Sequence, residues 1–183
     1  MAKPKTHPAK AKEELHNITK IGEAKIEDKT ERKQFLVFQL DEEDYAIDIL
    51  QANEILKMVP ITRIPSTPDF VRGVINLRGK IVVVVDAEKK IKLKPREETP
   101  DTRIIIAELE EKQIGIVVDS VSEVIWIPVA DIKGTPKTLE KKVELDYIKG
   151  VAIVGERLVI VLNLEKLLNE DEMKDIVEIQ KSY

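Results

Sequence analysis

An internal repeat restricts the fold of this chain more than any other feature of the sequence. Two matches without gaps define the repeat: residues 36–56 align with 105–125, and residues 70–91 align with 147–168. The register changes between the two matches, so the second half carries extra residues between them. Such self-similarity indicates that one supersecondary unit occurs twice. We therefore expect two equivalent halves, about 36–91 and 105–168.

Each half reads as two β-hairpins joined by a connector. In the first half, FLVFQL and YAIDIL flank the acidic turn DEED, and both runs are rich in aromatic and β-branched residues. The prolines Pro60, Pro65 and Pro68 then interrupt regular structure. Two hairpins alone expose an apolar face and unpaired edges, which closure into a small barrel removes. The pattern predicts an all-β protein of two packed β-barrels, one for each half.

Four further segments have their own signals. Residues 81–85, IVVVV, are apolar on both strand faces, so we expect burial from both sides where the barrels meet. Residues 50–56 suit a short helical turn, and residues 92–101, with two prolines and alternating charge, suit an exposed connector. Residues 169–180 predict a closing helix, because Asn169 and the acidic first turn form a typical N-terminus.

Composition divides the chain into a tail and a domain. Residues 1–33 carry many lysines and few large apolar side chains, which predicts a flexible tail, and 34–183 predict the folded domain. With 43% apolar residues the domain can build a core. The sequence has no cysteine and no uncharged apolar run of membrane-spanning length, so we expect a cytoplasmic protein without direct membrane insertion.

The chemistry available to the domain is limited. The histidines His7 and His16 lie in the expected tail and there is no thiol, so we expect no enzyme, no metal site and no cofactor. The acidic cluster at residues 42–44 predicts a solvated turn. Aromatic residues make up only 4% of the chain and the net charge is −4, which argues against nucleic acid as a partner.

Arg78 stands out within GVINLRGKIVVVVD, residues 73–86. Its counterpart in the second half is Gly155, so the fold does not require a guanidinium there. Two interpretations stay open: an exposed turn residue with its stem on apolar surface, or a donor in a protein-binding site. For Trp126 we expect packing in the core, because aromatic rings usually bury their area.

The order of these motifs resembles the CheW family of bacterial chemotaxis coupling proteins. The resemblance covers about residues 34–173, and GVINLRG followed by a valine-rich strand that ends in Asp86 is its most specific part. Val83 stands where the family commonly has proline. The resemblance implies two intertwined five-stranded SH3-like barrels with short helices and a C-terminal helix, and a non-catalytic adaptor.

The same resemblance implies partners and sites. The partners would be the regulatory domain of the histidine kinase CheA and the cytoplasmic tips of chemoreceptors, in arrays at the inner membrane. Receptor binding would involve Gly73, Asn76, Leu77, Arg78 and Val117, and kinase binding would involve Ala52, Glu54 and Ile55. The alternative from another class is a small β-barrel oligonucleotide-binding protein.

Overall fold

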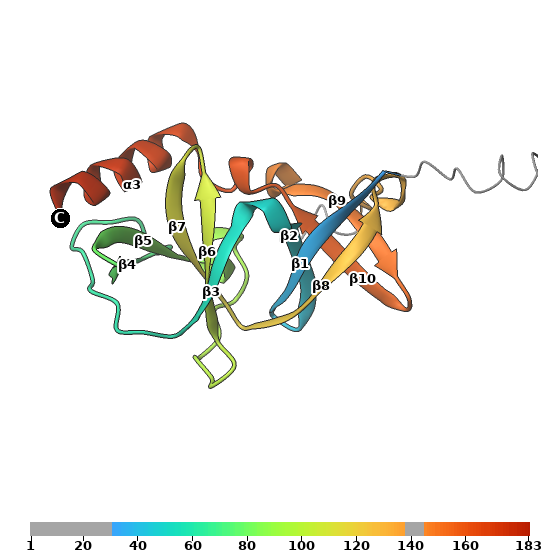
Figure 1. The fold of residues 1–183 in the computed structure, drawn as a ribbon, viewed down its shortest axis with the longest axis horizontal. Helices are drawn as coiled ribbons and strands as arrows, with labels where there is room; N and C mark the ends of the chain where they lie inside the picture. Colours follow the sequence, from blue (N-terminus) through green and yellow to red (C-terminus); the bar gives the residue numbers. More distant parts are fainter. Residues whose placement is uncertain (1–30, 138–144) are drawn as a thin grey trace, which may run out of the picture. The chain divides into compact units, whose positions relative to one another are not determined.

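The computed structural model describes residues 31–137 and 145–183, which form two five-stranded sheets (Figure 1). The first sheet has the order β8 (Ser120–Pro128), β1 (Arg32–Leu40), β2 (Glu43–Asp48), β10 (Arg157–Leu162), β9 (Ile148–Val154). The second sheet has the order β3 (Ala52–Lys57), β6 (Arg103–Leu109), β7 (Lys112–Val118), β5 (Lys80–Asp86), β4 (Val71–Leu77). The helical elements are η1 (Ile49–Gln51), α2 (Ala87–Lys90), η2 (Val129–Asp131), η3 (Leu145–Tyr147), η4 (Leu164–Lys166) and α3 (Glu170–Ser182).

Each sheet combines one hairpin from each half of the repeat. The β1–β2 hairpin joins the β9–β10 hairpin through parallel pairing of β2 with β10, and β4–β5 joins β6–β7 through parallel pairing of β5 with β7. The repeat equates β1 to β5 with β6 to β10, so the two strand orders are the same. The expectation of one barrel for each half is wrong, and the intertwined arrangement is confirmed.

The short links between the sheets explain why the two halves exchange hairpins. Only Ile49–Gln51 separate β2 from β3, and only Asp119 separates β7 from β8. Links this short carry the chain forward into the neighbouring sheet and cannot turn it back onto its own hairpin. Each half therefore starts in one sheet and continues in the other.

One glycine in each sheet allows that sheet to close into a barrel. The segment after β3 pairs with β4 through two backbone hydrogen bonds of 2.9 Å between Thr62 and Val74. A Cβ on Gly73 would lie 2.1 Å from the Thr62 carbonyl oxygen, and one on Gly150 would lie 2.5 Å from the corresponding oxygen of Lys133. Only glycine fits at such a backbone approach, which explains why Gly73 and Gly150 are identical in the two repeats.

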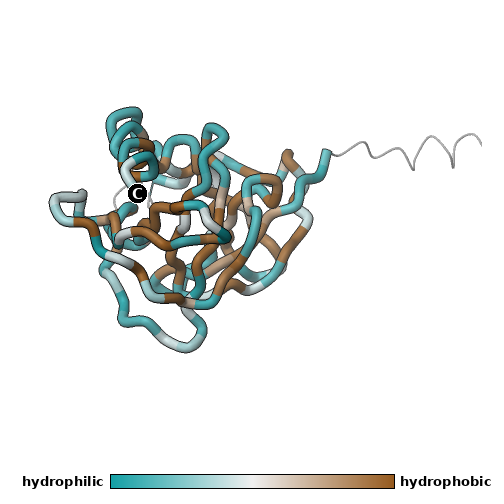
Figure 2. Tube along the Cα trace, turned by 60° about the vertical axis from the view of Figure 1, so that its left-hand side comes forward, coloured by the Kyte–Doolittle hydropathy of each residue, from teal (hydrophilic) through white to brown (hydrophobic). Residues whose placement is uncertain are grey.

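The buried side chains form three clusters that follow the same symmetry. The first-sheet interior contains Phe35, Val37, Ala46, Ile127, Ala152, Val159 and Val161. The second-sheet interior contains Ile75, Val82, Val84, Ile104, Ile106 and Val117. A larger cluster draws on both sheets and on α3, and it contains Val83 and Val85. The expected burial of 81–85 is confirmed for Val82 to Val85. Figure 2 shows hydrophobic stretches through the middle of the fold and hydrophilic loops around them.

The C-terminal helix α3 begins after Asn169, as expected. The Asn169 side chain accepts the backbone N–H of Glu172, and the Glu172 side chain accepts the backbone N–H of Asn169, so a full capping box is present. Met173 and Ile176 are buried in the cluster that draws on both sheets. The amphipathic face of α3 thus closes the core.

A buried ion pair joins α2 to the first turn of α3. Lys90 Nζ lies 2.7 Å from each carboxylate oxygen of Glu172, and the lysine side chain is only 7% exposed. The Lys90 ammonium also lies 4.5 Å from the centre of the Phe70 ring and 5.6 Å from that of Tyr147. Phe70 and Tyr147 are equivalent positions of the repeat, so each half supplies one ring.

Two local expectations are wrong. Residues 50–56 contain helical structure only in η1, and β3 begins at Ala52, because pairing with β6 overrides the local helical preference. Trp126 is 60% exposed. Its neighbours Ile125 and Ile127 pack into the first-sheet interior, so strand alternation turns the Trp126 ring outward.

An arginine of the connector pairs with the acidic turn between β1 and β2. The expected connector 92–101 is mostly exposed, but Arg96 lies 3.3 Å from Asp41 and 3.1 Å from Glu42 in the β1–β2 turn. That acidic turn is therefore paired and not simply solvated. β1 begins at Arg32, two residues before the expected domain boundary, and the rest of the expected tail, residues 1–30, lies outside the described residues.

Candidate functional site

The residues expected to bind partners all lie in the second sheet and the turn of its β4–β5 hairpin. Ala52, Glu54 and Ile55 lie on β3, Gly73, Asn76 and Leu77 on β4, Arg78 in the turn, and Val117 on β7. β3 and β4 form the two edges of the strand order β3-β6-β7-β5-β4. Closure of the barrel brings these edges towards each other.

The turn holds Arg78 in a backbone conformation that suits glycine. Leu77 pairs with Lys80, so Arg78 and Gly79 form a two-residue turn with φ values of 50° and 82°. The Asn76 side chain accepts the Gly79 backbone N–H at 2.8 Å. Positive φ at a residue with a long side chain costs about 1 kcal/mol. The second hairpin places Gly155, with φ of 64°, at the equivalent position.

A two-pronged ion pair joins the turn to β3. One guanidinium nitrogen of Arg78 donates to both carboxylate oxygens of Glu54, at 2.6 and 2.7 Å. The hydrogen bond and the negative charge of Glu54 raise the pKa of Arg78, so its charge is permanent. The Arg78 side chain nevertheless remains 71% exposed. The residues expected to bind the receptor and those expected to bind the kinase therefore touch.

A β-bulge sets the direction of Glu54. Ala52 pairs with Ala107 and Glu54 with Ile106, so Asn53 is an extra residue in β3. A bulge of this kind redirects the side chains that follow it. Ile55, next along the strand, is 44% exposed. The edge strand thus presents Glu54 on one face, where it pairs with Arg78, and the exposed Ile55 side chain on the other face.

Apolar residues form the floor of the site. Leu77 is half-buried and packs against the second-sheet interior, which contains Val117. Gly73 is buried, and its missing side chain leaves room for the Thr62 backbone. Gly73 and Val117 thus shape the site from beneath, and the exposed surface belongs to Asn76 and Arg78.

The first sheet repeats the ion pair with a shifted arginine. Arg157 in β10 pairs with Glu123 in β8, and Glu123 is the repeat counterpart of Glu54. A bulge at Ser122 precedes Glu123 in the same way. The arginine comes from a different position of the hairpin, which is why sequence alignment did not reveal the second pair. The presence of glutamate at both equivalent positions, Glu54 and Glu123, was the sequence signal that could have indicated the second pair.

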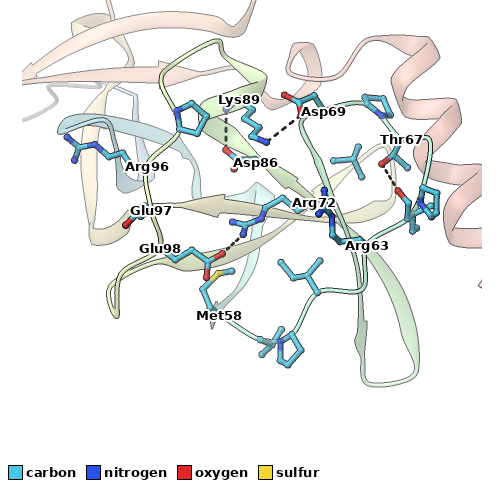
Figure 3. Close-up of a pocket in the computed structure, with 18 of the residues that line it drawn as sticks. Met58, Arg63, Thr67, Asp69, Arg72, Asp86, Lys89, Arg96, Glu97 and Glu98 are labelled. Atoms are coloured by element: carbon cyan, nitrogen blue, oxygen red, sulfur yellow. Dashed lines mark hydrogen bonds and ion pairs between the residues drawn. The ribbon is translucent and has the colours of Figure 1, made fainter.

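One pocket lies away from these residues. It has a volume of about 1050 Å³ and lies between the segment 58–72 and the connector residues 95–98 (Figure 3). Its charges are largely paired, since Arg72 bonds Glu98 and Lys89 lies 3.5 Å from Asp69. None of the expected partner-binding residues lines it.

Metal chemistry and membrane spanning find no support in the described ranges. Residues 31–137 and 145–183 contain no group of three histidine or acidic side chains placed to hold a metal ion. Among the same residues, no helix is long and apolar enough to cross a membrane.

Comparison with known proteins identifies relatives over most of the chain. A family model for the CheW-like domain matches residues 34–172. The chemotaxis protein CheW of Klebsiella aerogenes is 36% identical over 160 residues, which is 87% of this chain and 96% of that protein. The CheW protein of Helicobacter pylori is 36% identical over 148 residues, which is 81% of this chain and 88% of that protein.

A solved structure agrees with these sequence matches. The crystal structure of the scaffolding protein TtCheW from Thermoanaerobacter tengcongensis superposes with a TM-score of 0.71 at 37% identity, covering 78% of this chain and 91% of that one. The fold and the sequence point to the same relatives. The chain belongs to the CheW-like family, a family of non-catalytic chemotaxis scaffold proteins.

Proposed function

We propose that this chain couples the cytoplasmic tips of transmembrane chemoreceptors to the histidine kinase CheA by binding both. It acts in the cytoplasm and is recruited to receptor arrays at the inner membrane. The observation that carries the proposal is Arg78, whose side chain is 71% exposed and is held by Glu54, although the equivalent turn of the fold uses Gly155. An exposed and fixed arginine that the fold does not need favours a role in binding.

The receptor helix would contact the turn from the solvent side. Arg78 is 71% exposed, and its pairing with Glu54 holds the guanidinium in place while other N–H groups remain available. The half-buried Leu77 supplies the adjoining apolar surface, and it lies over the buried strand around Val117. A preorganised arginine beside an apolar floor is typical of the centre of a protein interface.

The kinase regulatory domain would contact β3. Ala52, Glu54 and Ile55 lie on this edge strand, and Ile55 offers an exposed apolar side chain. The half-buried Ala52 leaves a small side chain where a partner can approach. Because Glu54 also holds Arg78, the two surfaces are adjacent and share one residue pair.

The receptor surface is tested by Arg78→Gly. Glycine accepts the positive φ, so we expect the free energy of unfolding to change by less than about 1 kcal/mol. Receptor-fragment affinity should fall about 30-fold, which corresponds to about 2 kcal/mol. Arg157→Ala, which removes the equivalent pair in the first sheet, is the matched control and should bind the receptor fragment normally. Receptor affinity unchanged in Arg78→Gly would refute the assignment.

The kinase surface is tested by two variants of β3. Ala52→Arg should weaken binding of the kinase regulatory domain and leave receptor affinity intact, because the new side chain clashes only at β3. Glu54→Lys should weaken both, because it also places a like charge beside Arg78. Calorimetric titration with each partner measures both effects. Equal loss of both partners in folded Ala52→Arg would count against separate surfaces.

A further inference from the structure

Glu88 is a buried carboxyl group with one unsatisfied oxygen. It lies in α2 and is only 4% exposed. Its Oε2 accepts the backbone N–H of Arg96 at 2.7 Å. Its Oε1 is buried and has no hydrogen-bond partner among the described residues. A buried polar atom without a partner is costly, so a proton on Oε1 would resolve the anomaly if an acceptor lies nearby.

Asp119 is that acceptor. Parallel pairing of Asp86 in β5 with Val117 in β7 brings Glu88 and Asp119, each two residues further along the chain, to the same end of the second sheet. A side-chain hydrogen bond with Asp119 is among the causes that raise the pKa of Glu88. Asp119 already acts as a hydrogen-bond acceptor, since its Oδ2 accepts the backbone N–H of Asp41 at 2.9 Å. Two carboxylates have no hydrogen to share, so a hydrogen bond between them requires one proton.

The surroundings of Glu88 decide where the proton resides. Burial raises the pKa of Glu88 above its ordinary value of 4.5, the Arg96 backbone N–H opposes this, and the charges of Asp119 and Asp86 raise the pKa further. The groups that face Glu88 are Asp119 after β7, Asp86 at the end of β5, Tyr45 in β2 and Arg96 in the connector, whose guanidinium pairs with Asp41 and Glu42. Asp86 and Arg96 also appear on the pocket wall in Figure 3.

We infer that Glu88 holds its proton more tightly in the folded chain than in the unfolded chain, that its O–H donates to Asp119, and that this shared proton is a pH-sensitive link between the two sheets. α2 follows β5 of the second sheet, whereas Asp119 is the single residue between β7 and β8. The Asp119 backbone N–H donates to the Gln39 carbonyl oxygen at 3.0 Å, which anchors this crossover to β1 of the first sheet. Loss of the proton places two negative charges together and breaks the link.

The sign of the pH dependence follows from the link. The folded chain binds the Glu88 proton more tightly than the unfolded chain, so the contribution is complete below pH 4.5 and is lost as the pH rises through the pKa of Glu88. For each pH unit between 4.5 and that pKa, the folding equilibrium constant falls about tenfold. A rise in pH through the pKa of Glu88 would then loosen the junction between the sheets.

Carbon-13 NMR titration of the Glu88 carboxyl group in the full chain is the direct test. We expect Glu88 to titrate above 4.5 in the wild-type chain. In Asp119→Asn we expect a lower pKa of Glu88, because the asparagine N–H donates to ionised Glu88. Titration of wild-type Glu88 at or below 4.5, or an unchanged pKa in Asp119→Asn, overturns the inference.

Stability against pH provides the second readout. Glu88→Gln mimics the protonated form, since its amide accepts from Arg96 and donates to Asp119. The difference in folding equilibrium constant between this variant and the wild type should grow with pH above 4.5. Glu165→Gln is the control, because Glu165 is the exposed repeat counterpart of Glu88, and its profile should follow the wild type. Parallel profiles for Glu88→Gln and the wild type overturn the inference.

Discussion

Replacing Lys90 by methionine should destabilise the domain strongly. Methionine keeps most of the buried length of the side chain but removes the charge that lies 2.7 Å from both oxygens of Glu172. The Glu172 side chain is 19% exposed, so its charge would lose its partner in a mostly buried site. Breaking a buried ion pair costs about 3–5 kcal/mol, and loss of the contacts with the Phe70 and Tyr147 rings adds up to about 1 kcal/mol.

We take about 3 kcal/mol as the expected loss, since Glu172 retains some solvent and its hydrogen bond from Asn169. At this chain length the loss lowers the melting temperature by about 6–12 °C. Urea unfolding followed by circular dichroism measures the free energy, and Lys89→Met is the matched control. Within residues 31–137 and 145–183 the Lys89 ammonium pairs with Asp69, which is 93% exposed, so that variant should lose less than about 0.5 kcal/mol.

A double-mutant cycle separates the pair from general packing. Glu172→Gln keeps a side chain that suits the capping box and removes the negative charge. The double variant should lose less free energy of unfolding than the two single variants lose together, by about 2 kcal/mol or more. Additive losses, or a loss in Lys90→Met as small as in Lys89→Met, would show that the Lys90–Glu172 ion pair does not stabilise the packing of α3.

Two further predictions follow from backbone geometry and exposure. Gly73→Ala should lose about 3 kcal/mol or more of the free energy of unfolding, because its Cβ would lie 2.1 Å from the Thr62 carbonyl oxygen. Gly79→Ala has open space around it and should lose only about 1–2 kcal/mol from its positive φ. Similar losses for the two variants in urea unfolding would contradict closure of the barrel over Gly73. Trp126→Ser should change the free energy of unfolding by less than about 1 kcal/mol, because the ring is 60% exposed, and a much larger loss would place the ring in the core.

The repeat, the strand content and α3 could be predicted from the sequence because they depend on local patterns. Alternation of apolar residues locates strands, and the Asn169 capping box marks the start of a helix. The apolar pattern alone missed the exchange of hairpins, because the same pattern suits a hairpin in either sheet, and the intertwined arrangement came from the family resemblance. The short links at Ile49–Gln51 and Asp119 carried the missing information.

The candidate site was predictable only in part. Family resemblance selected Glu54 and Arg78, but for different partners, and no local pattern brings β3 next to the β4–β5 turn. Their contact arises from closure of the barrel, which depends on residues far apart in the chain. The exposure of Trp126 was missed for a similar reason, since the residue type favours burial and the strand register decides the face.

Simultaneous binding is the most direct test of the coupling role, because the two proposed surfaces meet at the Glu54–Arg78 pair. A receptor signalling fragment is titrated into the chain alone and into the chain saturated with the CheA regulatory domain. We predict a ternary complex, seen by light scattering after size-exclusion chromatography, with receptor affinity within a few-fold of that of the free chain. Displacement of the kinase domain by the receptor fragment would show that the surfaces overlap and would contradict the coupling role.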